Sequence, residues 1–137
     1  MNAHSPDDHR AQLAREHVIL LHRWIEAVFT GSADAQTHAA LLDSFSADFR
    51  LLGPQGRELD MHAVRTLFRE QAGQRPQLRI TVDQIEVIEA QGSLIACRHR
   101  ETHSTPDQHS QRASLALLRV DGQRVRWQFL QETALPG

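Results

Sequence analysis

The sequence predicts an α+β fold, with helices in its first half and strands in its second. Apolar residues recur every three or four positions as far as about residue 73, which is typical of helices with one buried face. After Pro76 apolar residues alternate with polar ones, which is typical of strands. The length of 137 residues and the hydrophobic content of 40% fit one packed domain. We expect this domain over residues 7–135, after a polar segment over residues 1–6.

Three helices are predicted in the first half, each from a capping residue followed by an apolar stripe. They cover about 6–30, 33–45 and 61–73, with expected N-caps at Ser5, Ser32 and Asp60. Gly31 suits the end of the first helix. Two short strands, at 49–52 and 57–59, are expected around a turn between the second and third helices.

Four strands are predicted in the second half, and they should form an antiparallel meander. They cover 78–87, 94–103, 111–120 and 124–133. The apolar positions change parity within the first of these strands. This change predicts a β-bulge near Asp83 and Gln84.

Two hairpin loops predict which side chains share a face of the sheet. A loop over 105–108 places Glu101 opposite Arg112 and His99 opposite Ser114. A two-residue loop at 121–122 then places Ser114 opposite Phe129. The resulting polar group lies at one end of an apolar face and consists of His99, Glu101, Arg112, Ser114 and Gln131, beside Trp127 and Phe129.

The opposite face of the predicted sheet combines leucines with arginines. Its members are Leu115, Leu117 and Leu130, with Arg98, Arg100, Arg119 and Arg126 around them. This composition favours a homodimer interface, because guanidinium groups pair with carboxylates and stack at such interfaces. A solvated face with a few exposed leucines remains the alternative.

The charge and composition of the chain limit the classes of partner that we expect it to bind. The formal net charge of -2 gives no reason to expect nucleic acid or an anionic membrane surface as a partner. No apolar run approaches the roughly 20 residues that cross a bilayer, so we expect a cytoplasmic protein. The single cysteine, Cys97, cannot form an internal disulfide.

The element order resembles the nuclear-transport-factor-2-like superfamily, whose cystatin-like fold includes SnoaL-like proteins. The segments that carry the resemblance lie at 45–49, 56–60 and 121–133. Bacterial members of unknown function, near the SnoaL-like proteins and the calcium/calmodulin-dependent kinase association domain, are the most similar. The resemblance implies three helices packed on a strongly curved antiparallel sheet, which together form a cone with an internal pocket, usually in a homodimer. It also implies that the first helix contributes to the pocket, through His17 and Trp24.

These observations favour the binding of a small, largely apolar molecule between sheet and helices. The expected ligand-binding residues are Arg112, Ser114, Trp127, Phe129, Gln131, His17 and Trp24. An enzyme of the isomerase, cyclase or dehydratase type is the alternative, with His99 and Glu101 as an acid/base pair. The absence of tyrosine disfavours the tyrosine-dependent reactions of the superfamily. An oligomerisation module with a vestigial pocket, and a structural ion pair between Glu101 and Arg112, also remain open.

His99, Glu101 and His103 alternate along one predicted strand, and residues of these types are common metal ligands. At about 3.3 Å per strand residue, however, the outer Cα atoms lie roughly 13 Å apart, near the limit for two imidazoles on one ion. A metal site with two ligands from this segment and a third from a distant part of the chain remains open. We expect neither a metal nor another cofactor.

Overall fold

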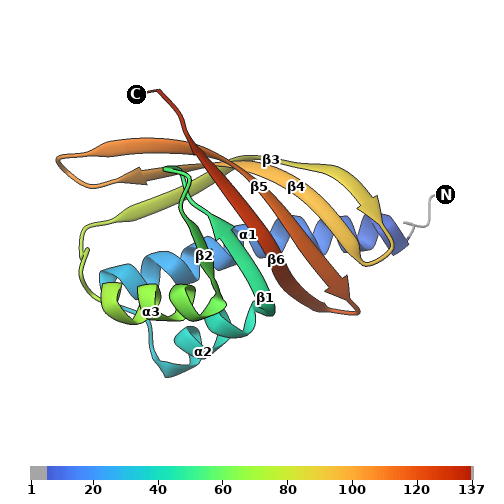
Figure 1. Ribbon diagram of the computed structural model, residues 1–137, viewed down its shortest axis with the longest axis horizontal. Helices are drawn as coiled ribbons and strands as arrows, with labels where there is room; N and C mark the ends of the chain where they lie inside the picture. Colours follow the sequence, from blue (N-terminus) through green and yellow to red (C-terminus); the bar gives the residue numbers. More distant parts are fainter. Residues whose placement is uncertain (1–5, 137) are drawn as a thin grey trace.

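The computed structural model describes residues 6–136 and confirms the α+β class (Figure 1). The predicted cap at Ser5 lies outside the described residues. The elements are α1 (Pro6–Thr30), α2 (Ala35–Asp43), β1 (Phe45–Leu52), β2 (Glu58–Asp60), α3 (Met61–Gln71), β3 (Arg79–Gln91), β4 (Leu94–Ser104), β5 (His109–Asp121) and β6 (Arg124–Ala134).

Capping side chains start α2 and α3. Asp60 caps α3 as predicted, since its carboxylate accepts a hydrogen bond from the Ala63 backbone N–H at 2.9 Å. The predicted cap of α2 at Ser32 is wrong. Asp34 takes this role and accepts from the Thr37 N–H at 2.8 Å, so α2 begins at Ala35.

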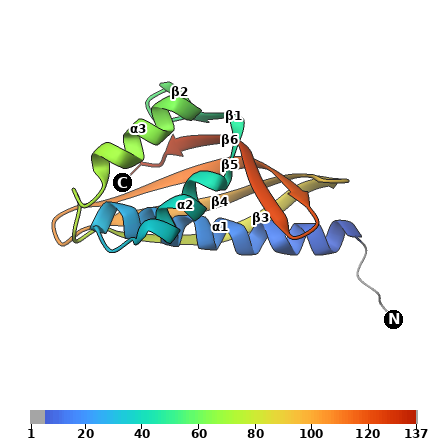
Figure 2. The ribbon, with the colours of Figure 1, turned by 90° about the horizontal axis from the view of Figure 1, so that it is seen from below.

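The strands form one six-stranded sheet in the order β2-β1-β6-β5-β4-β3. The predicted antiparallel meander of β3 to β6 is confirmed, and β1 adds to it by pairing with β6 in parallel. Helix α1 runs along one face of the sheet, which we call the inner face, whereas α2 and α3 lie near β1 and β2 (Figure 2). The strong curvature that we expected of this sheet is not confirmed, since the sheet is not strongly curled.

The register between β4 and β5 is the predicted one. Glu101 lies opposite Arg112, and His99 lies opposite Ser114. The predicted bulge in β3 is also confirmed: the pairing of β3 with β4 shifts between Asp83 and Glu86, and Gln84 has a φ of 54°.

The register between β5 and β6 differs from the prediction. Asp121 pairs with Arg124, so the hairpin loop consists of Gly122 and Gln123. The pairing then shifts between Leu118 opposite Trp127 and Leu117 opposite Phe129, which leaves Gln128 as an extra residue in β6.

This extra residue reverses the alternation in the rest of β6, because successive side chains of a strand point to opposite faces. Phe129 and Gln131 therefore lie on the outer face, and their predicted place beside His99 and Glu101 is wrong. Leu130 and Glu132 occupy the inner face instead, with Glu132 opposite Ser114. Leu130 is buried in the core and is removed from the predicted outer interface.

The hydrophobic core lies between α1 and the inner face of the sheet. Trp127 and Leu118 from the sheet are fully buried there, as are Val18 and Leu21 from α1. Among residues 6–136, no helix has both the length and the apolar character needed to cross a bilayer.

Candidate functional site

The inner face of β4 carries three buried polar side chains in succession. Alternate residues of this strand point into the core, and after Ile95 and Cys97 these positions hold His99, Glu101 and His103. Burial removes such groups from water, so each requires hydrogen-bonding partners within the protein.

Glu101 is the centre to which the neighbouring donors point. Its Oε2 atom lies 3.1 Å from Nε2 of His22 on α1 and 3.3 Å from Nε2 of His99. The same oxygen accepts a hydrogen bond from the Ser114 hydroxyl at 3.2 Å. Its Oε1 atom lies 2.9 Å from Nε2 of His103. We call these five residues the Glu101 cluster.

The contacts of His22 define its protonation. Its Nδ1 atom lies 2.7 Å from the Val18 carbonyl oxygen, and its Nε2 atom faces the Glu101 carboxylate. Both partners are acceptors, so each ring nitrogen must present a hydrogen when no other cation is bound. Burial lowers the pKa of His22, but the Glu101 charge and the hydrogen bonds to Glu101 and Val18 together raise it.

The carboxyl group of Glu101 is correspondingly held in its charged form. Burial raises its pKa, but the charge of His22 and the hydrogen bonds from His103, His22 and His99 lower it well below the ordinary value. His22 and Glu101 therefore form a buried ion pair that joins α1 to β4.

His99 contacts Glu101 as the predicted acid/base pair requires, but its side chain is fully enclosed. Burial lowers its pKa, which favours the neutral ring. The Nδ1 atom of this ring has no hydrogen-bond partner among the described residues. The partners of Glu101 lower its pKa, so this carboxylate is a weak proton acceptor near neutral pH.

Arg112 and Glu132 form the more accessible end of this polar region. Nη1 of Arg112 lies 3.3 Å from Oε1 of Glu132, and their side chains are 25% and 10% exposed. Burial and the nearby charge of Glu101 raise the pKa of Glu132 to about 7, while Arg112 opposes this rise. Among the described residues, the ion pair of Arg112 is with Glu132 and not with Glu101.

His17, Trp24 and Trp127 form an aromatic group beside the Glu101 cluster. The Trp127 indole N–H donates a hydrogen bond to Nδ1 of His17 at 3.0 Å, and the His17 ring meets Trp24 edge-on at 5.8 Å. Burial lowers the pKa of His17 to about 4, so the ring is neutral and accepts from Trp127. Trp127 also lies beside the rings of His22 and His99.

Sequence reasoning missed His22 and Glu132. A signal for His22 was present, because it follows Val18 by four residues and precedes Ile25 by three, on the buried face of α1. The predicted register does not bring Glu132 to the inner face, because it contains no bulge at Gln128.

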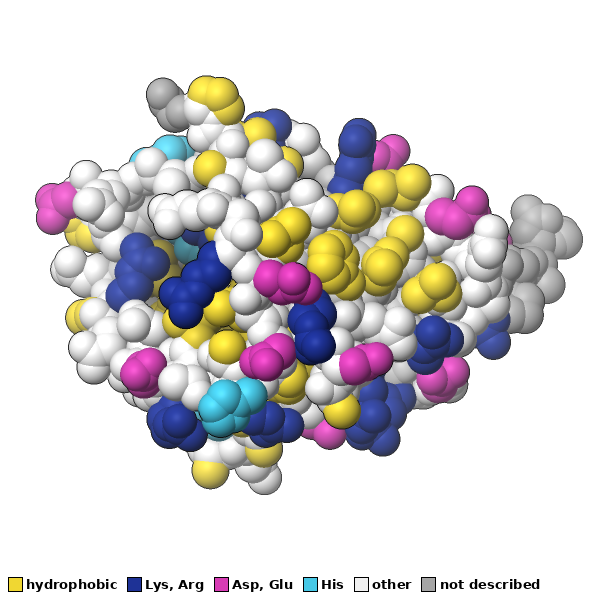
Figure 3. Space-filling view, viewed as in Figure 1, with side chains coloured by type: hydrophobic (Ala, Val, Ile, Leu, Met, Phe, Trp, Pro, Cys, Tyr) yellow, Lys and Arg dark blue, Asp and Glu magenta, His cyan; other side chains and the backbone are white. Residues whose placement is uncertain are grey.

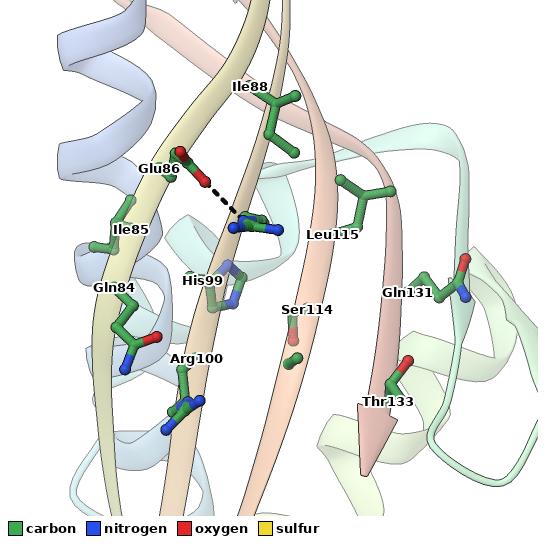
Figure 4. Close-up of a pocket in the computed structure, with 12 residues that line it drawn as sticks. Gln84, Ile85, Glu86, Ile88, His99, Arg100, Ser114, Leu115, Gln131 and Thr133 are labelled. Atoms are coloured by element: carbon green, nitrogen blue, oxygen red, sulfur yellow. Dashed lines mark hydrogen bonds and ion pairs between the residues drawn. The ribbon is translucent and has the colours of Figure 1, made fainter. Parts of the chain in front are cut away.

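The outer face of the same strands holds a shallow depression of about 770 Å³ (Figure 4). Ile88, Leu115 and Gln131 line it, and the Arg98 guanidinium pairs with Glu86 at 2.7 Å at its edge. Gln131 thus borders a surface depression of the outer face, and His99 and Ser114 of the Glu101 cluster, which are themselves buried, also line it.

Comparison with known proteins identifies the family of this chain. The model of the SnoaL-like domain matches residues 19–134. The chain belongs to this family. The SnoaL-like chain has the same fold as an NTF-2-like protein of unknown function from Pseudomonas aeruginosa, with 31% sequence identity and a TM-score of 0.87. That match covers 90% of this chain and 99% of the other.

More distant structures share the fold of this SnoaL-like chain. An NTF2-like protein of unknown function from Pseudomonas putida has 15% identity and a TM-score of 0.67, over 92% of this chain and 89% of that one. A protein of unknown function with a cystatin-like fold from Nostoc punctiforme has 14% identity and a TM-score of 0.62, over 90% and 94%. A search of curated proteins gave no match. The family match establishes the family and the solved structures establish the fold, so the chemistry must be argued from the site.

Replacing Glu101 with Gln should destabilise the protein strongly. The substitution keeps the size of the side chain but leaves the His22 imidazolium buried without its counter-charge. Breaking a buried ion pair from one side costs about 3–5 kcal/mol, measurable as the free energy of unfolding in urea. Glu58→Gln is the matched control, because it removes an exposed carboxylate 3.9 Å from Arg50 and should change little. Equal effects of the two substitutions would contradict the central role of Glu101.

His17 should make the protein less stable in acid. Its pKa is about 4 in the folded protein and 6.5 ordinarily, so between these values the unfolded chain binds a proton that the folded chain does not. The free energy of unfolding therefore falls as pH decreases from about 6.5 to 4, by an amount on the order of 2–3 kcal/mol from this residue.

Urea unfolding of the wild type and of His17→Gln at pH 7 and pH 4.5 isolates this contribution, since the other groups titrate in both proteins. The wild type should lose more stability than the variant on acidification. His109→Gln, at an exposed position, serves as the control. Parallel losses in wild type and His17→Gln would show that burial of His17 does not carry the effect.

Proposed function

We propose that this SnoaL-like chain is a homodimeric small-molecule-binding protein, and that its ligand places an anionic oxygen against Arg112. The observation that carries this proposal is a partly exposed guanidinium at the edge of a buried network of ionisable groups. Burying such groups costs free energy that an apolar core would avoid. Clusters of buried and perturbed ionisable groups are typical of functional sites.

Arg112 has the chemistry to recognise a carboxylate or an enolate oxygen. Its guanidinium offers several donors in one plane, and its contact with Glu132 uses Nη1. Nη2 has no partner among residues 6–136 that would compete with a ligand oxygen. Because the Arg112 side chain is 25% exposed, a ligand can reach it without opening the core.

Partly exposed apolar side chains on the same sheet suit the rest of such a ligand. Val82 lies opposite Glu101 in β3, and Leu51 lies beside Leu130, two residues from Glu132. Both are packed against the core but remain partly exposed. A ligand with an apolar body and one anionic head therefore matches the combination of these apolar side chains with Arg112.

The catalytic alternative has less support. His99 and Glu101 are in contact, but a base must reach its substrate, and the His99 side chain is fully enclosed. Glu101 is occupied by donors on both oxygens. Catalysis by these two residues would require the core to open, whereas a ligand can bind at the exposed Arg112 side chain without such a change.

Decanoate, which combines an apolar chain with a carboxylate, is the probe for this proposal. By isothermal titration calorimetry, Arg112→Gln should weaken decanoate binding at least tenfold, because a charge-assisted hydrogen bond is lost. Glu132→Gln should tighten it a few-fold, because a competing carboxylate is removed from Arg112. Arg50→Gln is the matched control, because it breaks another arginine–glutamate pair, between Arg50 on β1 and Glu58 on β2.

The proposal would be wrong if Arg112→Gln bound decanoate as tightly as the wild type. It would also be wrong if the wild type bound no decanoate at millimolar concentration. An equal loss of decanoate affinity in Arg50→Gln would show that the loss comes from the removal of a positive charge in general and not from the site at Arg112.

The outer face is the proposed dimer interface, and its partner is a second copy of this chain. Hydrophobic side chains gather over the strands on this face, with acidic and basic side chains among them (Figure 3). Ile88 and Leu115 are 53% and 38% exposed. Glu86 beside Arg98 and Arg100 gives the patch charges of both signs, so two identical copies of the patch can pair opposite charges across a two-fold contact. Arg119 and Arg126 instead contact Ser93 and Asp43 of their own chain.

Leu115→Arg should convert the dimer to a monomer, because it places a further positive charge beside Arg98 and Arg100 in the contact. Sedimentation velocity should then give about 15.5 kDa for the variant and twice this mass for the wild type. Leu20→Arg is the matched control, since Leu20 on α1 is also 38% exposed but lies outside the outer face. A monomeric wild type, or a dimer that survives Leu115→Arg, would exclude this interface.

A further inference from the structure

We propose that His22, His99 and Glu101 form a binding site for a divalent transition-metal ion such as Zn²⁺. One ligand atom from each residue, a ring nitrogen of each histidine and a carboxylate oxygen of Glu101, lies within 4.8 Å of the other two. His99 and Glu101 are two residues apart on the inner face of β4, and His22 approaches them from α1. This inference goes beyond the proposed function, since it involves neither Arg112 nor the ligand.

The separations of these atoms suit an ion placed between them. Oε2 of Glu101 lies 3.1 Å from Nε2 of His22 and 3.3 Å from Nε2 of His99. Zn²⁺ bonds to nitrogen and oxygen of about 2.0–2.2 Å in a tetrahedral arrangement place neighbouring ligand atoms roughly 3.3–3.5 Å apart. Small adjustments of the side chains would therefore bring the three ligand atoms within bonding distance of one ion.

The orientation of His22 is the one that a metal ligand requires. Its Nδ1 atom lies 2.7 Å from the Val18 carbonyl oxygen, which can only accept a hydrogen bond. When a metal ion replaces the Nε2 proton, the remaining proton of the ring lies on Nδ1, and the Nε2 lone pair is directed toward the ion beside Oε2 of Glu101. Hydrogen bonding of the second ring nitrogen to a backbone carbonyl is characteristic of metal-bound histidine.

Glu101 is also oriented from outside the proposed coordination shell. His103 contacts Oε1 at 2.9 Å and the Ser114 hydroxyl contacts Oε2 at 3.2 Å. These contacts hold the carboxylate so that Oε2 faces both histidines. Such supporting hydrogen bonds fix the geometry of ligating carboxylates.

The donor set indicates the class of metal and the type of site. Two imidazoles and one carboxylate suit zinc and other first-row divalent ions. Three protein ligands leave a coordination position for water or another small ligand, as in catalytic rather than purely structural zinc sites. The nearby carboxyl group of Glu132 is a further acidic group in this region.

The test uses the full chain after treatment with a chelator. Titration with Co²⁺ should give the visible ligand-field bands of a four-coordinate ion and saturate at one equivalent, and Zn²⁺ should displace it. His22→Gln and His99→Gln should each lower the affinity at least 100-fold. His103→Gln should lower it about 10-fold to 100-fold, since it removes only a supporting contact. His109→Gln, at an exposed position, should bind as the wild type does.

Circular dichroism of each variant shows whether it has folded, and a crystal of the wild type grown with Zn²⁺ supplies a readout that needs no substitution. An anomalous peak between His22, His99 and Glu101 would establish the site. A peak only at exposed histidines, unchanged binding in folded His22→Gln, or no binding of one equivalent at millimolar Zn²⁺ would overturn it. Arg112→Gln should keep its metal affinity, so the failure of this inference is distinguishable from that of the decanoate experiment.

Discussion

The contact between His22 and Glu101 is the interaction on which the inner face depends. It places a charged group from α1 against a charged group from β4 at 3.1 Å, inside a core that is otherwise largely apolar. Such a pair is favourable only with good geometry and further hydrogen bonds, because both groups lose their hydration. His99, His103 and Ser114 supply these bonds. The helix, the strand and the β4–β5 register must all be correct for this one carboxylate to be satisfied.

The sequence predicted the fold class, the three helices and the β4–β5 register, because each depends on local signals. The register follows from the short loop at 105–108, and the cap at Asp60 from its own side chain. The β6 register could not be predicted in this way. The bulge at Gln128 lies where β1 joins β6 in parallel, with the Trp127 N–H bonded to the Ser44 carbonyl at 2.7 Å. This contact between distant segments has no local signature.

The difference between local signals and contacts of distant segments also explains which parts of the site could be predicted. His99, Glu101, Arg112 and Ser114 lie on two strands joined by a hairpin, and they share the inner face as the loop length indicated. Phe129, Gln131 and Glu132 follow the bulge, so the predicted register has each of them on the wrong face: Phe129 and Gln131 on the inner face, and Glu132 on the outer one. The pairing of His22 with Glu101 depends on how α1 crosses the sheet, which periodicity alone does not specify.

His17 and His22 show how strongly the partner decides the state of a buried histidine. They lie five residues apart on the same helix, and both are packed beside Trp127. His17 accepts a hydrogen bond from the Trp127 indole N–H. Burial lowers its pKa to about 4, so the ring is neutral. His22 faces a carboxylate and a carbonyl oxygen, which outweigh its more complete burial and raise its pKa. Because only His22 directs a nitrogen at a carboxylate, it is the histidine of α1 with the chemistry to share a proton or a metal ion with the sheet.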